Sequence, residues 1–200
     1  GDLLKNADSA MYKAKEEGRN GFKFYTEDMS LEVMKKIVLE NKLREAIIND
    51  EFITYYQPQY NGNNDKLIGI EALVRWKDPK TNKLIPPYDF IPLAEDTGLI
   101  VEIDRIVMKK AIRDFSYLRK KGHDLETLSL NLSMKQLKSN DFINLLINIM
   151  EQYDCKSNSI ELEVTEGAIM EDPLSSIGKL ETISSYGIKL SVDDFGTGYS

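Results

Sequence analysis

The fold is decided by three short stretches, LSLNLS at 128–133, IELEVTE at 160–166 and IKLSVDDFG at 188–196. In each stretch leucine, isoleucine or valine occupies every second position, and mostly polar residues occupy the positions between them. Because side chains alternate between the two faces of a strand, each stretch predicts a strand with one apolar and one polar face. Asn131, Glu163 and Asp193 all fall on polar faces, and Asp194 follows directly.

Working outward, similar alternating runs and helical patterns fill most of the chain. Two further strands are predicted at 53–60 and 67–76, and helices are predicted at 101–121, 139–152 and 173–186. Alternation of strands with helices predicts an α/β fold with parallel strands, either a doubly wound sheet or a (β/α)8 barrel. A barrel needs eight strands and about 250 residues. Five candidate strands precede Ser200, so a barrel is expected to be incomplete here.

The N-terminal quarter of the chain has a different pattern. Apolar residues at helical spacing predict a helix over 2–17, and the alternating FKFYT predicts a short strand at 22–26. A helix and one strand cannot bury a core, so we interpret residues 1–26 as the tail of an upstream domain. A second helix, within 27–49, is expected to link this tail to the domain at 50–200.

The composition excludes several classes of function. A net charge of −7 argues against binding a nucleic-acid polymer through its phosphates. The chain has one histidine, His123, too few for an imidazole-rich zinc site or a histidine triad. No apolar run is long enough to cross a bilayer, so no membrane contact is expected within this segment. The single cysteine, Cys155, fits a reducing compartment, and we expect a cytoplasmic location even if upstream regions anchor the full protein in a membrane.

The polar strand ends predict a metal site. In α/β barrels functional groups gather at the carboxyl ends of the strands, where Glu71, Asn131, Glu163 and Asp193 are expected to meet. Three carboxylates and one amide are hard oxygen ligands that suit Mg²⁺ or Mn²⁺. With Asp194 reaching a second ion, two ions roughly 3.5–4 Å apart would stabilise the displacement at a phosphodiester.

Each of these residues also has a simpler explanation. An acid on a strand is most often exposed to solvent, Asp193 and Asp194 before Gly196 are also typical of a turn, and Asn131 is also compatible with a buried amide that satisfies backbone groups. Only the placement of these residues at successive strand ends favours a metal site.

A longer set of motifs resembles the EAL family of cyclic-di-GMP phosphodiesterases. The motifs occur in the family's order over about residues 40–200: YYQPQ at 55–59, EALVRW at 71–76, FIPLAEDTGLI at 90–100, SLNLS at 129–133, ELEVTE at 161–166 and DDFGTGYS at 193–200. The resemblance implies a (β/α)8-type barrel whose first strand runs against the others. It also implies that the full protein hydrolyses cyclic-di-GMP to the linear dinucleotide pGpG.

The resemblance assigns a role to particular residues. It implies one ion on Glu71, Asn131, Glu163 and Asp193, a second ion on Asp194, substrate contacts by Gln57, Leu73 and Arg75, and stabilisation of the DFGTGYS loop by Glu166. The guanidinium of Arg75 is planar and can donate two parallel hydrogen bonds, a geometry that suits a phosphate. The family's remaining lysine and its general-base glutamate are expected beyond Ser200, so no catalytic residue is assigned within the chain, and the 200-residue fragment alone is expected to be inactive.

The first 26 residues carry a second resemblance. The stretch ADSAMYKAKEEGRNGFKFY at 7–25 resembles the last helix and strand of a GGDEF diguanylate-cyclase domain, without the GGDEF loop that makes cyclic-di-GMP. One alternative for the whole remains open, a catalytically silent EAL module that binds cyclic-di-GMP as a receptor and signals through the helix at 30–49. The family resemblance also leaves open a homodimer formed through the EAL domain.

Overall fold

The computed structural model describes residues 2–16, 20–63, 65–165 and 173–193, which divide into two units at residue 45. The first unit holds helix α1 (Asp2–Glu16) and most of helix α2 (Glu27–Ile48), as predicted. The strand predicted at 22–26 is wrong, because this segment pairs with no other strand of the described residues. The rings of Phe22 and Phe24 pack edge to face with their centroids 5.4 Å apart, and both side chains are mostly exposed.

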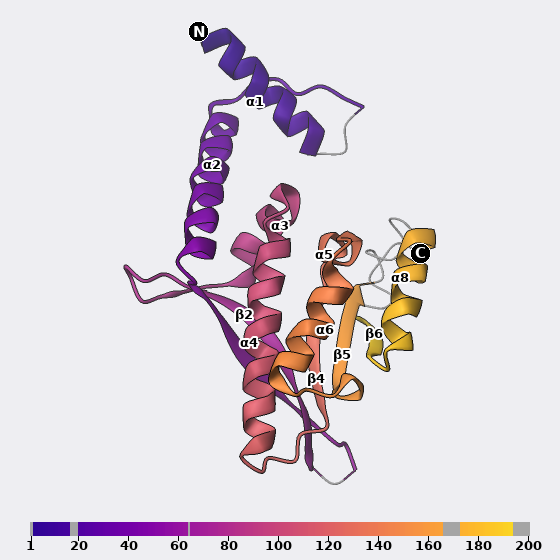
Figure 1. The fold of residues 1–200 in the computed structure, drawn as a ribbon. Coiled ribbons are helices and arrows are strands. Elements are labelled where there is room, and N and C mark those ends of the chain that lie inside the picture. Colours follow the sequence, from indigo (N-terminus) through magenta and orange to yellow (C-terminus); the bar gives the residue numbers. More distant parts are fainter. Residues whose placement is uncertain (1, 17–19, 64, 166–172, 194–200) are drawn as a thin grey trace. The chain divides into compact units, whose positions relative to one another are not determined.

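The second unit is built on one sheet (Figure 1). Its strands are β1 (Phe52–Tyr60), β2 (Leu67–Lys77), β3 (Leu84–Ile85), β4 (Thr127–Asn131), β5 (Ile160–Thr165) and β6 (Lys189–Asp193). The order is β1-β2-β4-β5-β6, with β3 paired to β2. Strands β2, β4, β5 and β6 are parallel, whereas β1 runs antiparallel to β2. The predicted α/β fold and the reversed first strand are therefore confirmed.

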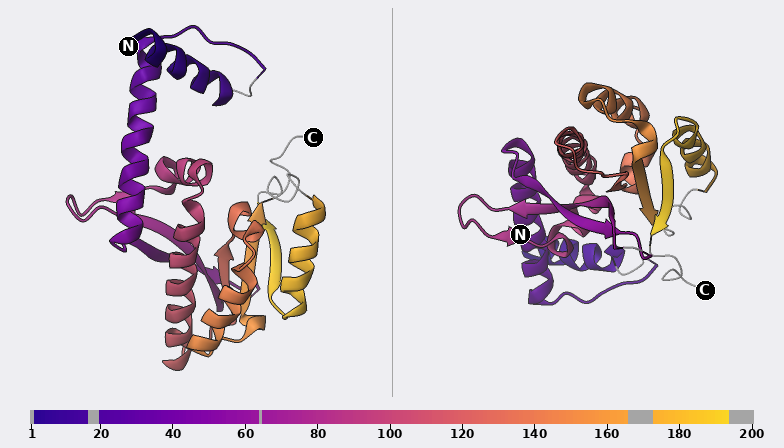
Figure 2. Two further views of the ribbon diagram at one scale, coloured as in Figure 1. Left: turned by 45° about the horizontal axis from the view of Figure 1, so that its top comes forward. Right: turned by 90° about the horizontal axis from the view of Figure 1, so that it is seen from below.

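Helices cover one face of this sheet (Figure 2). They are α4 (Ile100–Lys120), α6 (Phe142–Tyr153) and α8 (Pro173–Ser185), which lead from one parallel strand to the next. Among the described residues, no helix combines the length and the apolar character needed to span a membrane.

Two short helices were not expected from the sequence. Helix α3 (Pro87–Thr97) begins with a proline, whose missing N–H is harmless in a first turn, and ends at Gly98 with a left-handed φ of 80°. Pro92 lies inside this helix, although a proline in a helix interior lacks the N–H for the backbone hydrogen bond and usually disfavours a helix. Helix α5 (Met134–Lys138) has only five residues, too few for a periodic pattern.

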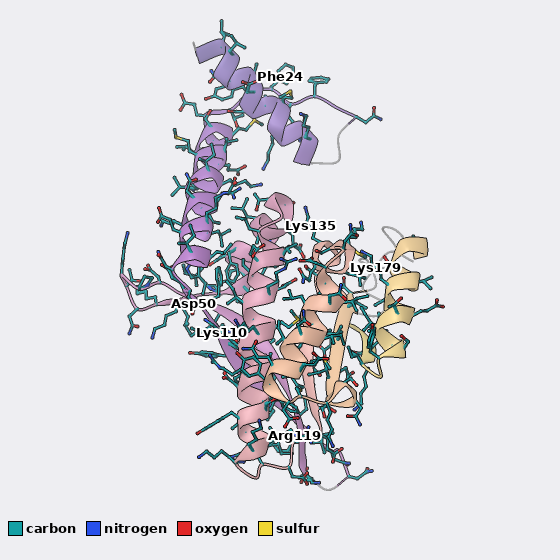
Figure 3. The ribbon with its side chains drawn as sticks, in the orientation of Figure 1. Phe24, Asp50, Lys110, Arg119, Lys135 and Lys179 are labelled. Atoms are coloured by element: carbon teal, nitrogen blue, oxygen red, sulfur yellow. The ribbon has the colours of Figure 1, made fainter. Side chains whose placement is uncertain are left out.

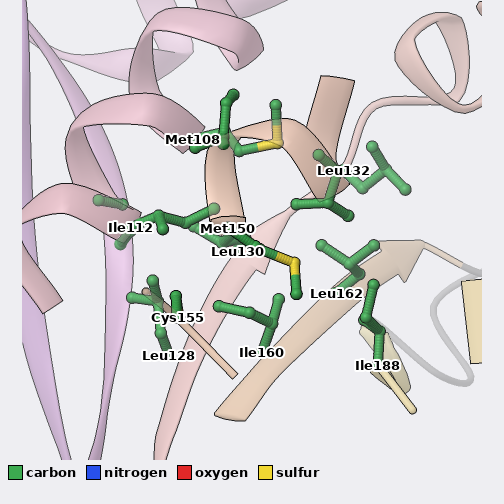
Figure 4. Close-up of a cluster of buried hydrophobic side chains, with 14 of the residues drawn as sticks. Met108, Ile112, Leu128, Leu130, Leu132, Met150, Cys155, Ile160, Leu162 and Ile188 are labelled. Carbon is green, nitrogen blue, oxygen red and sulfur yellow. The ribbon is translucent and has the colours of Figure 1, made fainter. Parts of the chain in front are cut away.

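The apolar strand faces form the core beneath these helices (Figure 4). Leu128 and Ile160 on neighbouring strands are fully buried and belong to one cluster with Met108 and Ile112 of α4. Burial of such side chains contributes about 1.5–3 kcal/mol each. Because this core holds the apolar face of β4 and β5, it directs the opposite, polar face away from the helices.

An aromatic cluster fixes α3 on the β1–β2 pair. The rings of Phe52, Trp76 and Phe90 lie 5.7–5.9 Å apart, and all three side chains are buried. The indole N–H of Trp76 donates to Glu51 Oε2 at 3.0 Å. Helix α3 is thereby held beside the carboxyl-terminal half of β2, where the candidate site lies.

Candidate active site

The register of the sheet places the predicted site residues in adjacent rows. Gln57 pairs with Glu71 across β1 and β2, and Asn131 pairs with Glu163 across β4 and β5. Each pair shares a face, because partners in register point the same way. The polar face predicted from the sequence is therefore formed by neighbouring strands of one sheet.

Glu71 and Asn131 are in direct contact. Asn131 Nδ2 donates a hydrogen bond to Glu71 Oε1 at 2.9 Å, although the two residues are far apart in the sequence. Glu71 is half-buried and Asn131 is exposed. The contact joins the middle of β2, where Glu71 lies instead of at the expected strand end, to the last residue of β4, and Asn131 is itself paired in register with Glu163.

A pocket of about 290 Å³ opens at this end of the sheet. Its sheet side includes Leu73, Arg75, Asn131, Glu163 and Thr165. Its helix side includes Pro87, Ile91, Glu95, Ile100, Asp104, Val107 and Met108 from the α3–α4 region. The sheet side also includes the apolar Ala72, Val74, Leu130 and Leu132, so both walls combine apolar side chains with a few polar or charged groups.

Arg75 is held in place by two contacts within the sheet. Its guanidinium donates to the Val74 carbonyl oxygen at 2.7 Å and lies over the Tyr55 ring at 5.5 Å from the centroid. These contacts restrict a flexible side chain. Among the described residues that line the pocket, Arg75 is the only cation. Gln57 is exposed on β1 and does not line the pocket, although it is paired in register with Glu71.

The structure leaves part of the predicted ligand set undescribed. The backbone of Asp193 ends β6 in register with Thr165, but its side chain, Asp194 and Glu166 lie outside the described residues. Among the described side chains, no three or more histidine, cysteine, aspartate or glutamate residues are close enough to hold a metal ion. The described part of the set supplies oxygen donors from Glu71, Asn131 and Glu163, which agree in type with a site for Mg²⁺ or Mn²⁺.

Asp104 is a site residue that the sequence reading missed. Its Oδ2 accepts hydrogen bonds from Ser133 Oγ at 2.5 Å and from the Ser133 N–H at 3.3 Å. Burial raises the pKa of Asp104 from 3.8 to about 7; the Ser133 hydrogen bonds oppose this rise, and the Glu95 carboxylate adds to it. Burial, together with the neighbouring Asp96, also raises the pKa of Glu95. A signal existed in the sequence, because Asp104 lies four residues from both Ile100 and Met108 on the buried face of a helix.

Helix α5, directly after the site strand β4, is held at both ends. Ser133 is its N-cap, and Ser133 Oγ accepts from the Gln136 N–H at 3.2 Å. At the other end Lys179 of α8 donates to the carbonyl oxygens of Lys138 at 2.6 Å and Leu137 at 3.0 Å (Figure 3). A cation at a helix C-terminus is favourable. The segment that follows Asn131 is therefore anchored by side chains from other helices.

Comparison with known proteins gives consistent matches. The EAL domain family matches residues 40–200. The chain is 38% identical over 199 residues to the bifunctional diguanylate cyclase/cyclic di-GMP phosphodiesterase MucR of Pseudomonas aeruginosa, and 35% identical over 198 residues to the cyclic di-GMP phosphodiesterase PdeR of Escherichia coli. These alignments cover 100% and 99% of this chain, but the chain spans only 29% and 30% of the two relatives.

A solved structure agrees in fold. The PaMucR phosphodiesterase in complex with c-di-GMP superposes with a TM-score of 0.75 at 38% identity. The match covers 82% of this chain and 66% of that one.

Proposed function

The chain belongs to the EAL domain family, and from this premise we propose that it forms part of the site with which the full-length protein hydrolyses cyclic-di-GMP to pGpG, using divalent metal ions. One observation carries the proposal. Glu71 accepts a hydrogen bond at 2.9 Å from Asn131, which is paired in register with Glu163, and Asn131, Glu163 and Arg75 line one pocket. Oxygen donors and a fixed guanidinium are what a metal-assisted reaction at a phosphodiester requires.

We propose that Glu71, Asn131, Glu163 and Asp193 hold one Mg²⁺ or Mn²⁺ ion and that Asp194 serves a second. When bound, such ions polarise the phosphate and lower the pKa of a water molecule. The carboxylates keep the ions in place and, without them, would repel the substrate's phosphates, since like charges repel strongly where water is excluded.

Arg75 has a different part in the proposal. Its guanidinium is positioned by the Val74 carbonyl and the Tyr55 ring, so little side-chain freedom remains to be lost when it binds a phosphate oxygen. Leu73 on the same strand face supplies an apolar contact for the substrate. We also propose, from the family pattern alone, that Gln57 contacts the dinucleotide and that Glu166 steadies the loop after β6.

The test uses the full-length protein, cyclic-di-GMP and Mg²⁺ or Mn²⁺, with pGpG separated by chromatography. Glu71→Gln keeps the size of the side chain but removes its charge, and it should reduce turnover by roughly 100-fold or more, as loss of a metal ligand does. The matched control is Glu161→Gln, which removes a carboxylate from the same face of β5 as Glu163 at a position with no proposed metal-ligand role, and it should retain most of the turnover. Equal turnover in wild type and Glu71→Gln would remove Glu71 from the mechanism.

A second candidate function is the silent receptor. The pocket and Arg75 could bind cyclic-di-GMP whether or not the remaining catalytic groups are present. Titration calorimetry with cyclic-di-GMP separates the two functions. Binding without any pGpG, in the presence of either metal, would identify a receptor rather than an enzyme.

A further inference from the structure

We propose that Asp104 is a positioning residue for the metal site, because its carboxylate holds the junction between β4 and α5 so that Asn131 faces Glu71. The inference rests on the proposed function, in which Asn131 is a metal ligand. Asp104 itself is on α4, lines the same pocket as Asn131 and is assigned no ligand role.

The hydroxyl and the N–H of Ser133 make three hydrogen bonds, two of them to Asp104. Its hydroxyl donates to Asp104 Oδ2 at 2.5 Å and accepts from the Gln136 N–H at 3.2 Å, while its own N–H donates to the same Oδ2 at 3.3 Å. A hydroxyl has one donor hydrogen, which here is directed to Asp104. Both the side chain and the backbone of Ser133 are therefore oriented by one carboxylate.

Ser133 follows Asn131 by two residues. Asn131 is the last residue of β4, and the Leu132 N–H that follows it donates to the Glu163 carbonyl oxygen at 2.9 Å. Consecutive Cα atoms are about 3.8 Å apart, so a shift of Ser133 is transmitted to a residue only two positions away. Asp104 and the Glu163 backbone thus fix the chain just beyond Asn131.

The contacts of Asp104 act on the start of α5 only. Lys179 also holds the far end of α5 independently of Asp104. Loss of the Asp104 carboxylate is therefore expected to loosen the junction locally and leave the rest of α5 in place.

The experiment compares three variants of the full-length protein by calorimetric titration with Mn²⁺. Asp104→Ala should weaken Mn²⁺ binding about 10–100-fold, the usual loss when a partner of a metal ligand is removed. Asp104→Asn keeps an acceptor oxygen for Ser133 and should restore most of the affinity. The control is Asp114→Ala on the same helix, which loses the 2.8 Å hydrogen bond from Tyr56 Oη but should leave Mn²⁺ binding unchanged.

A second readout needs no metal. The NMR resonance of the Asn131 side-chain amide and the exchange protection of the Gln136 amide should change in Asp104→Ala and not in Asp114→Ala. Ser133→Ala removes the same hydrogen bond from the other partner and should reproduce these effects, which covers the case in which Asp104→Ala does not fold. The double variant should lose no more than either single variant.

The two readouts separate this inference from the proposed function. If wild type binds no Mn²⁺, the proposed metal chemistry fails, and the Asn131 resonance alone decides the positioning role. Folded Asp104→Ala or Ser133→Ala protein with an unchanged Asn131 resonance would overturn the inference, as would unchanged Mn²⁺ affinity in a wild type that binds the metal.

Discussion

Replacing Gly69 with alanine tests how closely β2 packs against β4 beside the site. A Cβ on Gly69 would lie 2.8 Å from the Thr127 carbonyl oxygen and 2.8 Å from Gln59 Oε1. The Gln59 amide can rotate away only by disturbing its 3.2 Å hydrogen bond to Ser129 Oγ, and the Thr127 carbonyl belongs to the backbone of the neighbouring strand.

The expected magnitude follows from three terms. Overpacking costs about 1–3 kcal/mol, and disturbing the Gln59 hydrogen bond adds about 0.5–1.5 kcal/mol. The lower entropy of unfolded alanine returns about 0.4–1 kcal/mol. Gly69→Ala should therefore lower the free energy of unfolding by about 2 kcal/mol.

The assay is urea unfolding followed by the fluorescence of Trp76, the single tryptophan of the chain, which is buried in the second unit. Gly178→Ala is the matched control. It lies within α8 with no atom within 4 Å of its added Cβ, so it should stabilise the protein by about 0.5–1 kcal/mol. A free energy of unfolding for Gly69→Ala within about 0.5 kcal/mol of wild type would refute the reasoning, because changes that small are typical of substitutions on the surface and not of a closely packed position.

Three further predictions concern the core, α5 and pH. Leu128→Ala should lower the free energy of unfolding by about 2–5 kcal/mol in the same urea assay, because Leu128 is fully buried. Lys179→Met should lower the free energy of unfolding by about 1.5–3 kcal/mol, because it removes charged hydrogen bonds to α5. The control Lys135→Met, at an exposed position, should change this free energy by less than about 0.5 kcal/mol. Equal effects of the two substitutions would contradict the anchoring role of Lys179. Burial raises the pKa of Asp104 to about 7, so the folded protein binds a proton on this carboxyl group more tightly than the unfolded chain does. Protonated Asp104 therefore stabilises the folded state at low pH, and this stabilisation is lost as the pH rises from about 4 through 7. Over this pH range the free energy of unfolding of the wild type should fall by up to about 4 kcal/mol relative to that of Asp104→Asn. Parallel curves of unfolding free energy against pH for the two proteins would contradict the raised pKa.

Much of the local structure could be predicted from the sequence. Alternation of apolar and polar residues identified β4, β5 and β6 and placed Asn131 and Glu163 on their polar faces, which the register confirms. The failed strand at 22–26 has the same kind of alternation but no partner among the described residues, because a pattern reports which side chains alternate and not whether a neighbour exists.

Other predictions stay predictions. They include the two metal ions, the roles of Asp193, Asp194 and Glu166, the homodimer, the cytoplasmic location and the assignment of residues 1–26 to the end of a GGDEF domain. The matches to relatives support the family and do not test these points.

The sequence by itself determined the α/β class, the faces of the strands and the oxygen character of the site, because these depend on residue type and on periods of two or about 3.6 residues. Only the tertiary structure decided that Asn131 bonds to Glu71 and that Asp104 holds Ser133. Both contacts join strands or helices that are far apart along the chain. Their geometry depends on strand register and helix packing, which no local pattern contains.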